Sequence, residues 1–114
     1  MESTKSQKMA QAAFQTIESR EITKEFASFA RSFPALIHAC GLAQALAFGH
    51  EKHPEYLNDL AAVLVAAGHR EASSAESLAE ATRTQPVAAY VRLSRSALQA
   101  AGWLKRYAEA AQTK

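Results

Sequence analysis

The residues best suited to bind a polyanion lie in the last quarter of the 114-residue chain. They recur at spacings of three or four, so one helix would carry them all on a single face: Arg92, Arg95, Gln99, Trp103 and Arg106. A guanidinium group suits phosphate because its planar fork donates two parallel hydrogen bonds. A flat aromatic ring nearby can stack on an unpaired base. The pattern indicates a nucleic-acid contact or a contact with an acidic protein; a merely solvated face, with Trp103 tucked under a neighbouring helix, is the third interpretation.

Residue sets typical of catalysis are missing from the sequence. His50 and His53 are three apart, but Pro54 follows at once and no third ligand stands at a metal spacing. His38 lies in an apolar stretch and is expected in the core or an interface, and Cys40 is expected to be a small buried residue. The chain has no Gly-rich phosphate loop, G-x-S-x-G or H-E-x-x-H motif. We therefore expect a non-catalytic chain with no metal, no cofactor and no small-molecule substrate.

The composition indicates which elements must position the arginines. Alanine, the best helix former, occurs 26 times, whereas the β-branched residues valine and isoleucine occur only four and three times. Apolar residues make up 48% and charged residues 21% of the chain, which argues against disorder. The sequence therefore predicts an all-α, compact single-domain bundle of about five or six helices over residues 1–114, with residues 1–5 as a flexible N-terminal arm.

Hydrophobic periodicity predicts six helices. The first four cover about residues 6–19, 23–32, 35–49 and 54–68, a short fifth follows, and the sixth covers about 86–112. Ser73 and Glu76 form an S-x-x-E capping box at the start of the fifth. Pro34 is expected to mark a bend, and Gly41 to permit close helix packing. The third helix is apolar nearly all round, so it is the best candidate for the central helix, with the sixth flanking it.

The same periodicity predicts which positions face the core. The expected set is Ala10, Ala13, Phe14 and Ile17 in the first helix, Ile22, Phe26, Phe29 and Phe33 along the second, Leu57, Leu60, Ala61 and Leu64 in the fourth, Leu78 with Ala81 or Thr82 in the fifth, and Tyr90, Ser94, Ala97, Leu98, Ala101, Leu104 and Ala108 in the sixth. In the sixth helix this stripe lies opposite the arginine row.

Cysteine usage and the apolar runs indicate a compartment. A single cysteine excludes an internal disulfide and fits a reducing cytoplasm. The start, MESTKSQK, is polar, so no secretory signal is expected. The run over 32–49, which has no charged residue, is interrupted by Pro34, His38 and Gly41 and is better explained as a buried helix than as a membrane span. We expect a cytoplasmic protein with no membrane partner.

Charge is distributed unevenly along the chain. Residues 51–80 carry a net charge of −4, and residues 81–108 carry +5 with no acid at all. Such asymmetry suggests that the partner is a polyanion or an acidic protein face. The acidic segment is in turn expected to meet a neighbouring protein, such as the basic face of another copy. A head-to-tail contact of that kind produces an open filament.

Three stretches carry a resemblance to a known family: PALIHACGLAQALAF at 34–48, YVRLSR at 90–95 and GWLKRYAEA at 102–110. Together they resemble the small helical subunit of the type III-B CRISPR RAMP-module effector, the Cmr complex. The matching positions are Gln7, Ala10 and Ala13; Pro34, Ile37, Gly41, Leu42, Gln44, Leu46, Ala47 and Phe48; and Tyr90, Ser94, Arg95, Trp103, Lys105 and Arg106. The resemblance covers almost the whole chain in the right order, and residues 51–85 match only as helical filler.

The resemblance implies a function. Members of that family are non-catalytic bundles that stack into a filament along the crRNA-bearing backbone subunits and help to hold the guide–target RNA duplex. The implied partners are crRNA and target RNA together with other Cmr subunits, including further copies of this chain. The main alternative is a helical adaptor whose arginine face docks an acidic protein and never touches RNA.

Particular residues are expected to make the RNA contact. Arg92, Arg95 and Arg106 are the primary candidates for phosphate contact, since their guanidinium groups share one face. The secondary candidates are Lys105, Arg83, Lys24 and Arg31, with Lys5 and Lys8 as a mobile basic arm and Trp103 either stacked on a base or part of the core.

Overall fold

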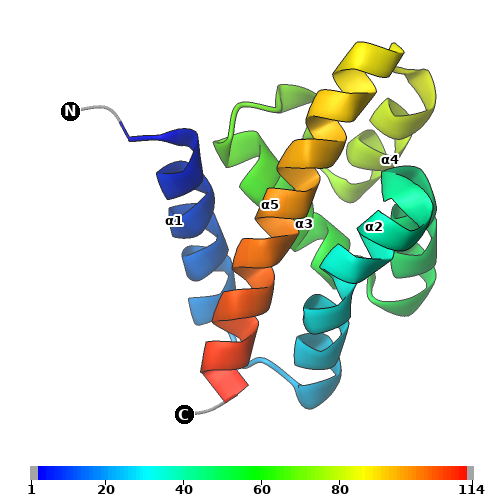
Figure 1. The fold of residues 1–114 in the computed structure, drawn as a ribbon. Coiled ribbons are helices and arrows are strands. Elements are labelled where there is room, and N and C mark those ends of the chain that lie inside the picture. Colours follow the sequence, from blue (N-terminus) through cyan, green and yellow to red (C-terminus); the bar gives the residue numbers. More distant parts are fainter. Residues whose placement is uncertain (1–2, 113–114) are drawn as a thin grey trace.

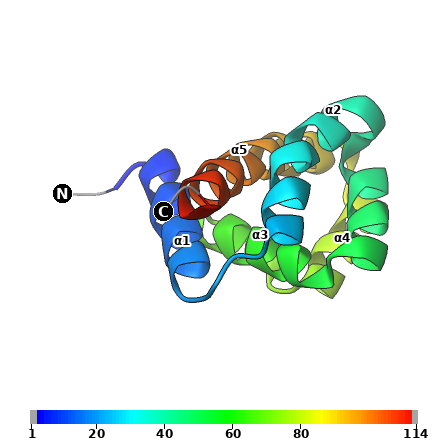
Figure 2. The same ribbon diagram turned by 90° about the horizontal axis from the view of Figure 1, so that it is seen from below.

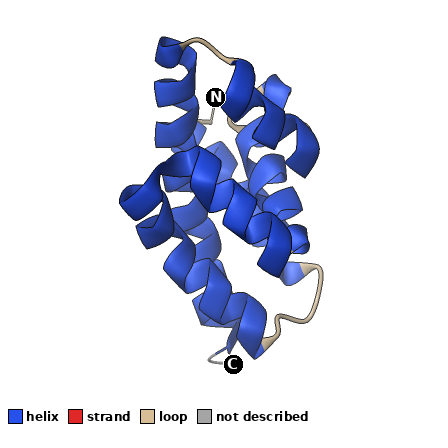
Figure 3. Ribbon diagram, turned by 90° about the vertical axis from the view of Figure 1, so that its right-hand side faces the viewer, coloured by secondary structure: helices blue, strands red, loops and turns tan. Residues whose placement is uncertain are grey.

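The computed structural model describes residues 3–112, and five α-helices and one short 3-10 turn account for nearly all of them (Figure 1). The elements are α1 (Lys5–Glu18), α2 (Lys24–Lys52), α3 (Pro54–Ala66), η1 (Arg70–Ala72), α4 (Ala75–Thr84) and α5 (Val87–Gln112). Seen from below, α5 lies over α3, with α1 on one side and α2 and α4 on the other (Figure 2). Residues 3–112 contain helices and loops but no strand, which confirms the all-α class (Figure 3).

The long helix α5 is the element around which the others gather, because α1, α2 and α3 all contact it. Its buried positions are mostly small: Leu93, Ser96, Ala97, Ala100, Ala101, Leu104 and Ala108. The expected inward stripe is correct at Ala97, Ala101, Leu104 and Ala108. Tyr90 and Leu98 are partly buried and pack against the core, and Ser94 is partly buried. The fully buried face also includes Leu93, Ser96 and Ala100, which the prediction did not name.

The most enclosed helix is α3, not the segment 35–49 that was expected at the centre. Seven of its thirteen residues are buried, among them all four predicted positions, Leu57, Leu60, Ala61 and Leu64. Segment 35–49 buries only the side that faces α3 and α5, and its other side, with His38 and Phe48, is exposed. By length and apolar composition alone, α2 is also long and apolar enough to cross a membrane. Of its most apolar 18-residue window, 33% is buried within the bundle.

The two helices expected over 23–32 and 35–49 form one element with a break at Gly41. The helix continues through Pro34, so the bend expected there is wrong, and the chain turns instead at Gly41, where φ is +84° and ψ is 162°. Essentially only glycine adopts this backbone conformation. Close packing is not the reason for the glycine, since a Cβ there would lie 3.7 Å from the Tyr90 hydroxyl, an ordinary contact. That hydroxyl accepts a hydrogen bond from the Ala43 N–H, 3.3 Å away, just beyond the break.

The break folds the two arms of α2, residues 24–40 and 42–52, toward each other around an aromatic cluster. The predicted inward positions Ile22, Phe26, Phe29 and Phe33 are all buried. Phe29 contacts Tyr56 of α3 edge-on at 5.2 Å and stacks beside Phe48 of the other arm at 6.3 Å, ring centre to ring centre. Tyr56 is fully buried, burial raises the pKa of its phenol far above the usual range, and within residues 3–112 its hydroxyl has no hydrogen-bond partner.

The start of α1 is fixed by a capping box and by a contact with α5. Thr4 Oγ1 accepts from the Gln7 N–H at 3.0 Å, and the Thr4 N–H donates to Gln7 Oε1 at 2.8 Å. The Lys5 ammonium donates to Ser96 Oγ at 2.6 Å, and His69 Nε2 lies 2.7 Å from the same oxygen. Lys5 therefore belongs to α1 and is not part of a mobile arm.

Two further local expectations are corrected. In α1 the buried stripe is Met9, Ala13 and Ile17, because Met9 takes the inward place expected for Ala10, which is partly buried, and Phe14 is 45% exposed. In α4 the capping residue is Ser74, not Ser73: Ser74 Oγ accepts from the Ser77 N–H at 3.1 Å. The inward positions Leu78 and Ala81 of α4 are both buried, as predicted.

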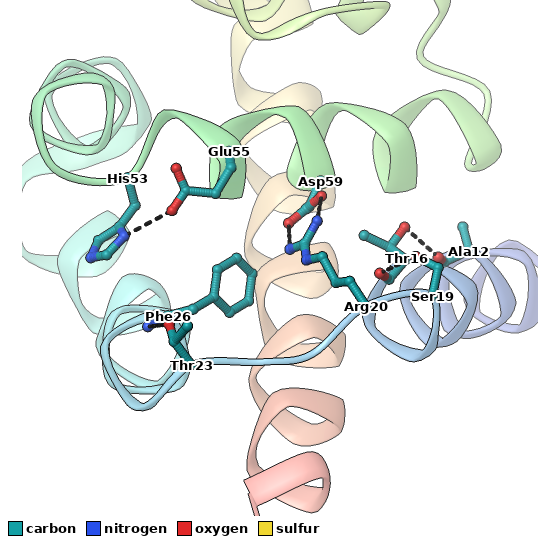
Figure 4. A network of polar contacts seen from close by, with 9 residues as sticks. All are labelled: Ala12, Thr16, Ser19, Arg20, Thr23, Phe26, His53, Glu55 and Asp59. Atoms are coloured by element: carbon teal, nitrogen blue, oxygen red, sulfur yellow. Dashed lines mark hydrogen bonds and ion pairs between the residues drawn. The ribbon is translucent and has the colours of Figure 1, made fainter.

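A partly buried ion pair ties the loop between α1 and α2 to α3 (Figure 4). The Arg20 guanidinium donates from both terminal nitrogens to the two Asp59 oxygens, one of these contacts being 3.0 Å, and its carbon lies 4.7 Å from the centre of the Phe26 ring. The Asp59 side chain is 8% exposed and that of Arg20 is 36% exposed. Burial raises the pKa of Asp59 above its ordinary value, although the Arg20 guanidinium acts in the opposite direction.

Replacing Gly41 by alanine tests the break in α2. The variant Gly41→Ala must place a Cβ on a backbone with φ of +84°, so we expect it to lose roughly 1–3 kcal/mol of unfolding free energy. The control Gly102→Ala lies within helical α5, where an added Cβ meets nothing within 4 Å. It should gain about 0.5–1 kcal/mol. Urea unfolding of both variants measures the difference, and a Gly41→Ala protein as stable as the control would contradict the positive φ.

Removing Arg20 tests the ion pair. Arg20→Ala leaves the Asp59 carboxylate buried and unpaired, so the raised pKa of Asp59 rises further. The free energy of unfolding therefore falls as the pH rises from the ordinary pKa of 3.8 to the raised value, and the loss persists in full at any higher pH. We expect the variant to lose about 2–3 kcal/mol of unfolding free energy at pH 7 and clearly less near pH 4. The loss at pH 7 is smaller than for a fully buried ion pair because Arg20 is partly exposed. Urea unfolding at both pH values checks this, and an equal loss at each would argue against it.

Candidate nucleic-acid interface

The predicted arginine row is present on the outer side of α5. Arg92, Arg95, Gln99 and Arg106 are exposed or partly exposed, and Trp103 is partly buried. The helix period places these residues opposite Ala97, Ala101, Leu104 and Ala108, which face α1, α2 and α3. From the first to the last arginine the row spans about 21 Å, given a rise of about 1.5 Å per residue.

The guanidinium groups of this row are free to bind a ligand. Within residues 3–112, no hydrogen bond or ion pair to protein engages Arg92, Arg95 or Arg106. Residues 81–108 contain no acid, and the first acid beyond them, Glu109, contacts Arg31 at 3.5 Å. Three exposed cations without a compensating carboxylate give this face a positive potential, which suits an anionic partner.

The secondary cations fall into separate groups. Lys24 and Arg31 are exposed on α2 beside the end of α5, where Arg31 pairs with Glu109 and the Gln112 amide donates to the Ile22 carbonyl. Arg83 is exposed in the last turn of α4, next to the start of α5, and Lys105 is partly buried. Lys8 is exposed on α1. The structure thus brings Arg83 and the Lys24–Arg31 group to opposite ends of the arginine row, and Arg31 is partly neutralised.

Trp103 is built into the edge of the core. Its ring stacks on that of Tyr107, with centres 5.9 Å apart and planes at 18°. Tyr107 in turn meets Phe14 of α1 edge-on at 5.5 Å. Because Trp103 is partly buried and packs against the hydrophobic core, packing accounts for it better than base stacking does.

Two exposed apolar residues extend the row and were missed by the sequence reasoning. Val87 is 79% exposed and Val91 is 39% exposed, both in the first two turns of α5. A signal was available, because Val87, Val91 and Arg95 follow one another at spacings of four and therefore share a face. Exposed apolar groups beside arginines are typical of protein interfaces.

The acidic segment is only partly available to a partner. Glu51, Glu76 and Glu80 are exposed, whereas Asp59 is buried against Arg20. Glu71 is engaged: His69 Nδ1 lies 3.4 Å from its carboxylate, and the Gln85 amide donates to it at 3.0 Å. Partial burial raises the pKa of Glu71, but hydrogen bonds from its own backbone, Gln85 and His69 outweigh that effect and hold the pKa below its ordinary value.

The residues weighed for catalysis or metal binding do not form a cluster. His38 is exposed, which excludes the core position but not the interface that was the other expectation for it. Cys40 is partly buried with its thiol 3.2 Å from the Leu36 carbonyl. His50 is exposed, and His53 Nδ1 lies 3.0 Å from a Glu55 oxygen. Within residues 3–112, no three His, Cys, Asp or Glu side chains are placed to hold a metal ion.

Comparison with known proteins defines the class to which this helical bundle belongs. Residues 5–111 match the family model described as CRISPR-associated protein (Cas_Cmr5). The chain therefore belongs to the Cmr5 family of CRISPR-associated proteins. This membership confirms the resemblance to the small subunit of the type III-B Cmr complex that was drawn from residues 34–48, 90–95 and 102–110.

Individual relatives agree with the family match. A protein of Thermus thermophilus described as CRISPR system Cmr subunit Cmr5 is 41% identical over 116 residues, which cover 94% of this chain and 95% of the relative. The crystal structure of a CRISPR-associated Cmr5 family protein from the same organism superimposes with a TM-score of 0.82 at 36% identity. That match covers 96% of this chain and 97% of the solved one. The fold is therefore shared along nearly the whole length.

Truncating Trp103 tests its role in packing. Because the indole stacks on Tyr107 and is partly buried, we expect Trp103→Ala to lose about 2 kcal/mol of unfolding free energy, less than the roughly 3–5 kcal/mol of a fully buried aromatic. The control Gln99→Ala, a position one turn earlier on the same face, should change stability by less than about 0.5 kcal/mol. Urea unfolding compares the two. Equal stabilities would show that Trp103 contributes nothing to the core and would return it to the set of free stacking groups.

Proposed function

We propose that the chain is a non-catalytic small subunit of a type III-B CRISPR (Cmr) effector, acting in the cytoplasm, and that it contacts the crRNA–target RNA through the outer face of α5. The observation that carries this proposal is the row of three exposed guanidinium groups, Arg92, Arg95 and Arg106, which have no partner within residues 3–112. Membership of the Cmr5 family, and the 41% identical Cmr subunit, support the assignment to such a complex.

The geometry suits binding to a phosphate backbone without reading of bases. The arginines are fixed on a 26-residue helix whose other side is packed against three helices, so little conformational freedom of the backbone is lost on binding. Each planar guanidinium group can hold a phosphate through two hydrogen bonds. Contacts of this kind position a nucleic acid irrespective of sequence, and their affinity falls as salt rises.

Copies of the chain are proposed to stack head to tail. The exposed carboxylates Glu51, Glu76 and Glu80 lie on α2 and α4, whereas the unpaired arginines lie on α5. Two different patches of opposite charge on one molecule favour a heterologous contact, which leaves each added copy with a free patch and so builds an open filament. The flat shape, 42 × 40 × 21 Å in its principal extents, offers broad faces for such stacking.

The second candidate function is an adaptor whose α5 face docks an acidic protein. Val87 and Val91 favour this function. Their side chains are 79% and 39% exposed in the same part of α5 as Arg92 and Arg95, and burying an apolar side chain against a protein surface is more favourable than placing it beside a phosphate. In this case the same arginines would pair with carboxylates of a partner subunit and never meet RNA.

Charge reversal separates the two functions. A complex assembled with the variant Arg92→Glu/Arg95→Glu/Arg106→Glu should retain target RNA at least about tenfold less well at about 0.15 M salt, because three phosphate contacts become repulsive. The slope of log affinity against log salt concentration should become shallower, its magnitude decreasing by about two to three. The variant Arg70→Glu reverses one exposed cation on η1 that is not among the candidates for RNA contact, and it serves as the control. Filter binding of labelled RNA across a salt series provides both quantities.

The outcome of assembly decides between the candidates. Loss of RNA retention with intact incorporation into the complex supports the RNA contact. Unchanged RNA retention together with failed incorporation supports the adaptor and overturns the RNA contact.

A further inference from the structure

A shallow groove, open to solvent, lies between the two arms of α2, and no residue of α5 lines it. Its volume is about 510 Å³. Lys24, Ser28 and Phe29 line it from the first arm, Phe48 and Lys52 line it from the second, and His53 also contributes to the lining. The groove exists because the break at Gly41 turns the second arm back beside the first.

The floor of the groove is aromatic. Phe48 is 44% exposed and stacks beside the buried Phe29, with planes at 14°. Gly49 permits this approach of the arms, because a Cβ there would lie 3.4 Å from the Phe29 ring and 2.9 Å from Leu57. An exposed phenylalanine held flat against another ring is a preformed surface for stacking a planar group.

The rims of the groove are cationic. Lys24 and Lys52 are exposed on opposite arms, and no residue within 3–112 forms an ion pair with either. Lys52 Nζ lies 5.9 Å from the centre of the Phe48 ring. The groove contains a single carboxylate, Glu25, against the two ammonium groups. The exposed aromatic ring suits a nucleobase, and the two ammonium groups suit the phosphate attached to it.

We propose that this groove binds one unpaired nucleotide of single-stranded RNA, with the base on Phe48 and the phosphate between Lys24 and Lys52. The Lys52 ammonium gives up its place over the ring when a base stacks there, and so becomes available to the phosphate. A purely apolar side chain of a protein partner would use Phe48 but would leave both ammonium groups unpaired. The proposal deepens the proposed RNA contact, on which it rests, and adds a base-directed site, tolerant of sequence, that is distinct from the arginine row.

Paired phenylalanine variants test the groove. Phe48→Leu keeps an apolar side chain but removes the stacking surface, and Phe14→Leu does the same at a position that is equally exposed, 45% against 44%. A short oligouridylate is titrated into the full chain at low salt, beside a matched strand with one abasic position. We expect Phe48→Leu to weaken binding about fivefold or more, which corresponds to the lower end of base–aromatic stacking. It should also bind the intact and abasic strands alike, whereas Phe14→Leu should behave as the parent.

Photocrosslinking locates the contact directly. Target RNA containing 5-iodouridine is irradiated in the assembled complex, and mass spectrometry should find the adduct at Phe48. The inference is overturned if the Phe48→Leu and Phe14→Leu proteins bind the oligouridylate with equal affinity, or if the oligouridylate does not bind at all. It is also overturned if the crosslinked adduct lies elsewhere on the chain. A fourth contradicting outcome is that an oligoglutamate peptide displaces the RNA strand equally well from the parent protein and from the Lys24→Gln/Lys52→Gln variant. The α5 arginine variant gives a separate readout, because its loss should be equal for intact and abasic strands. The two proposals can therefore fail independently.

Discussion

Close contact along the small inner face of α5 is the constraint on which the rest of the structure depends. Ala97, Ala100, Ala101 and Ala108 are completely buried, and α1, α2 and α3 all pack against this helix. Small side chains let three helices approach one axis, and a larger side chain at any of these positions would push its neighbours apart at a cost of about 1–3 kcal/mol. The same packing fixes the rotation of α5. The outward direction of the arginine row is thus a consequence of alanine packing on the opposite side.

A second constraint acts on α2 and produces a different surface. Gly41 lets the chain leave helical geometry for one residue and resume it, and the Tyr90 hydroxyl accepts from an N–H that the break leaves near the start of the second arm. The folded arms then enclose Phe29 against Tyr56 and leave Phe48 exposed in a groove. One backbone position therefore accounts for both a buried aromatic cluster and an exposed cationic groove. The two proposed RNA contacts depend on separate elements of the fold.

Much of the architecture could be predicted from local signals. The class, the four inward positions of α3 and the outward direction of Arg92, Arg95 and Arg106 follow from composition and helical period. The rotation of α5 could not be fixed in this way, because alanines occur on several sides of it and the apolar stripe is therefore broad. The bend was placed at Pro34, a strong local signal, but an α-helix can pass through proline at the loss of one hydrogen bond. Gly41 tolerates both helix and positive φ, so its sequence context did not reveal the break.

The remaining features depend on contacts between residues that are distant in sequence. Lys5 is 91 residues from Ser96, and Arg20 is 39 from Asp59. No periodicity relates such pairs, so Lys5 was assigned to a mobile arm, and the whole acidic segment 51–80, which contains Asp59, was expected to meet a neighbouring protein. The sequence likewise did not reveal the groove at Phe48, because Lys24 and Lys52 line one groove only after α2 folds on itself. Local patterns predict elements and their faces, whereas polar pairs and grooves require the tertiary arrangement.

The burial of Tyr56 gives the protein a built-in optical signal. The chain has three tyrosines, and the raised pKa of Tyr56 keeps its phenol neutral as long as the helices remain packed around it. In an alkaline titration followed by ultraviolet absorbance, Tyr56 should form phenolate only as the bundle comes apart. The contribution of Tyr56 to the tyrosinate spectrum therefore reports on unfolding without any added dye.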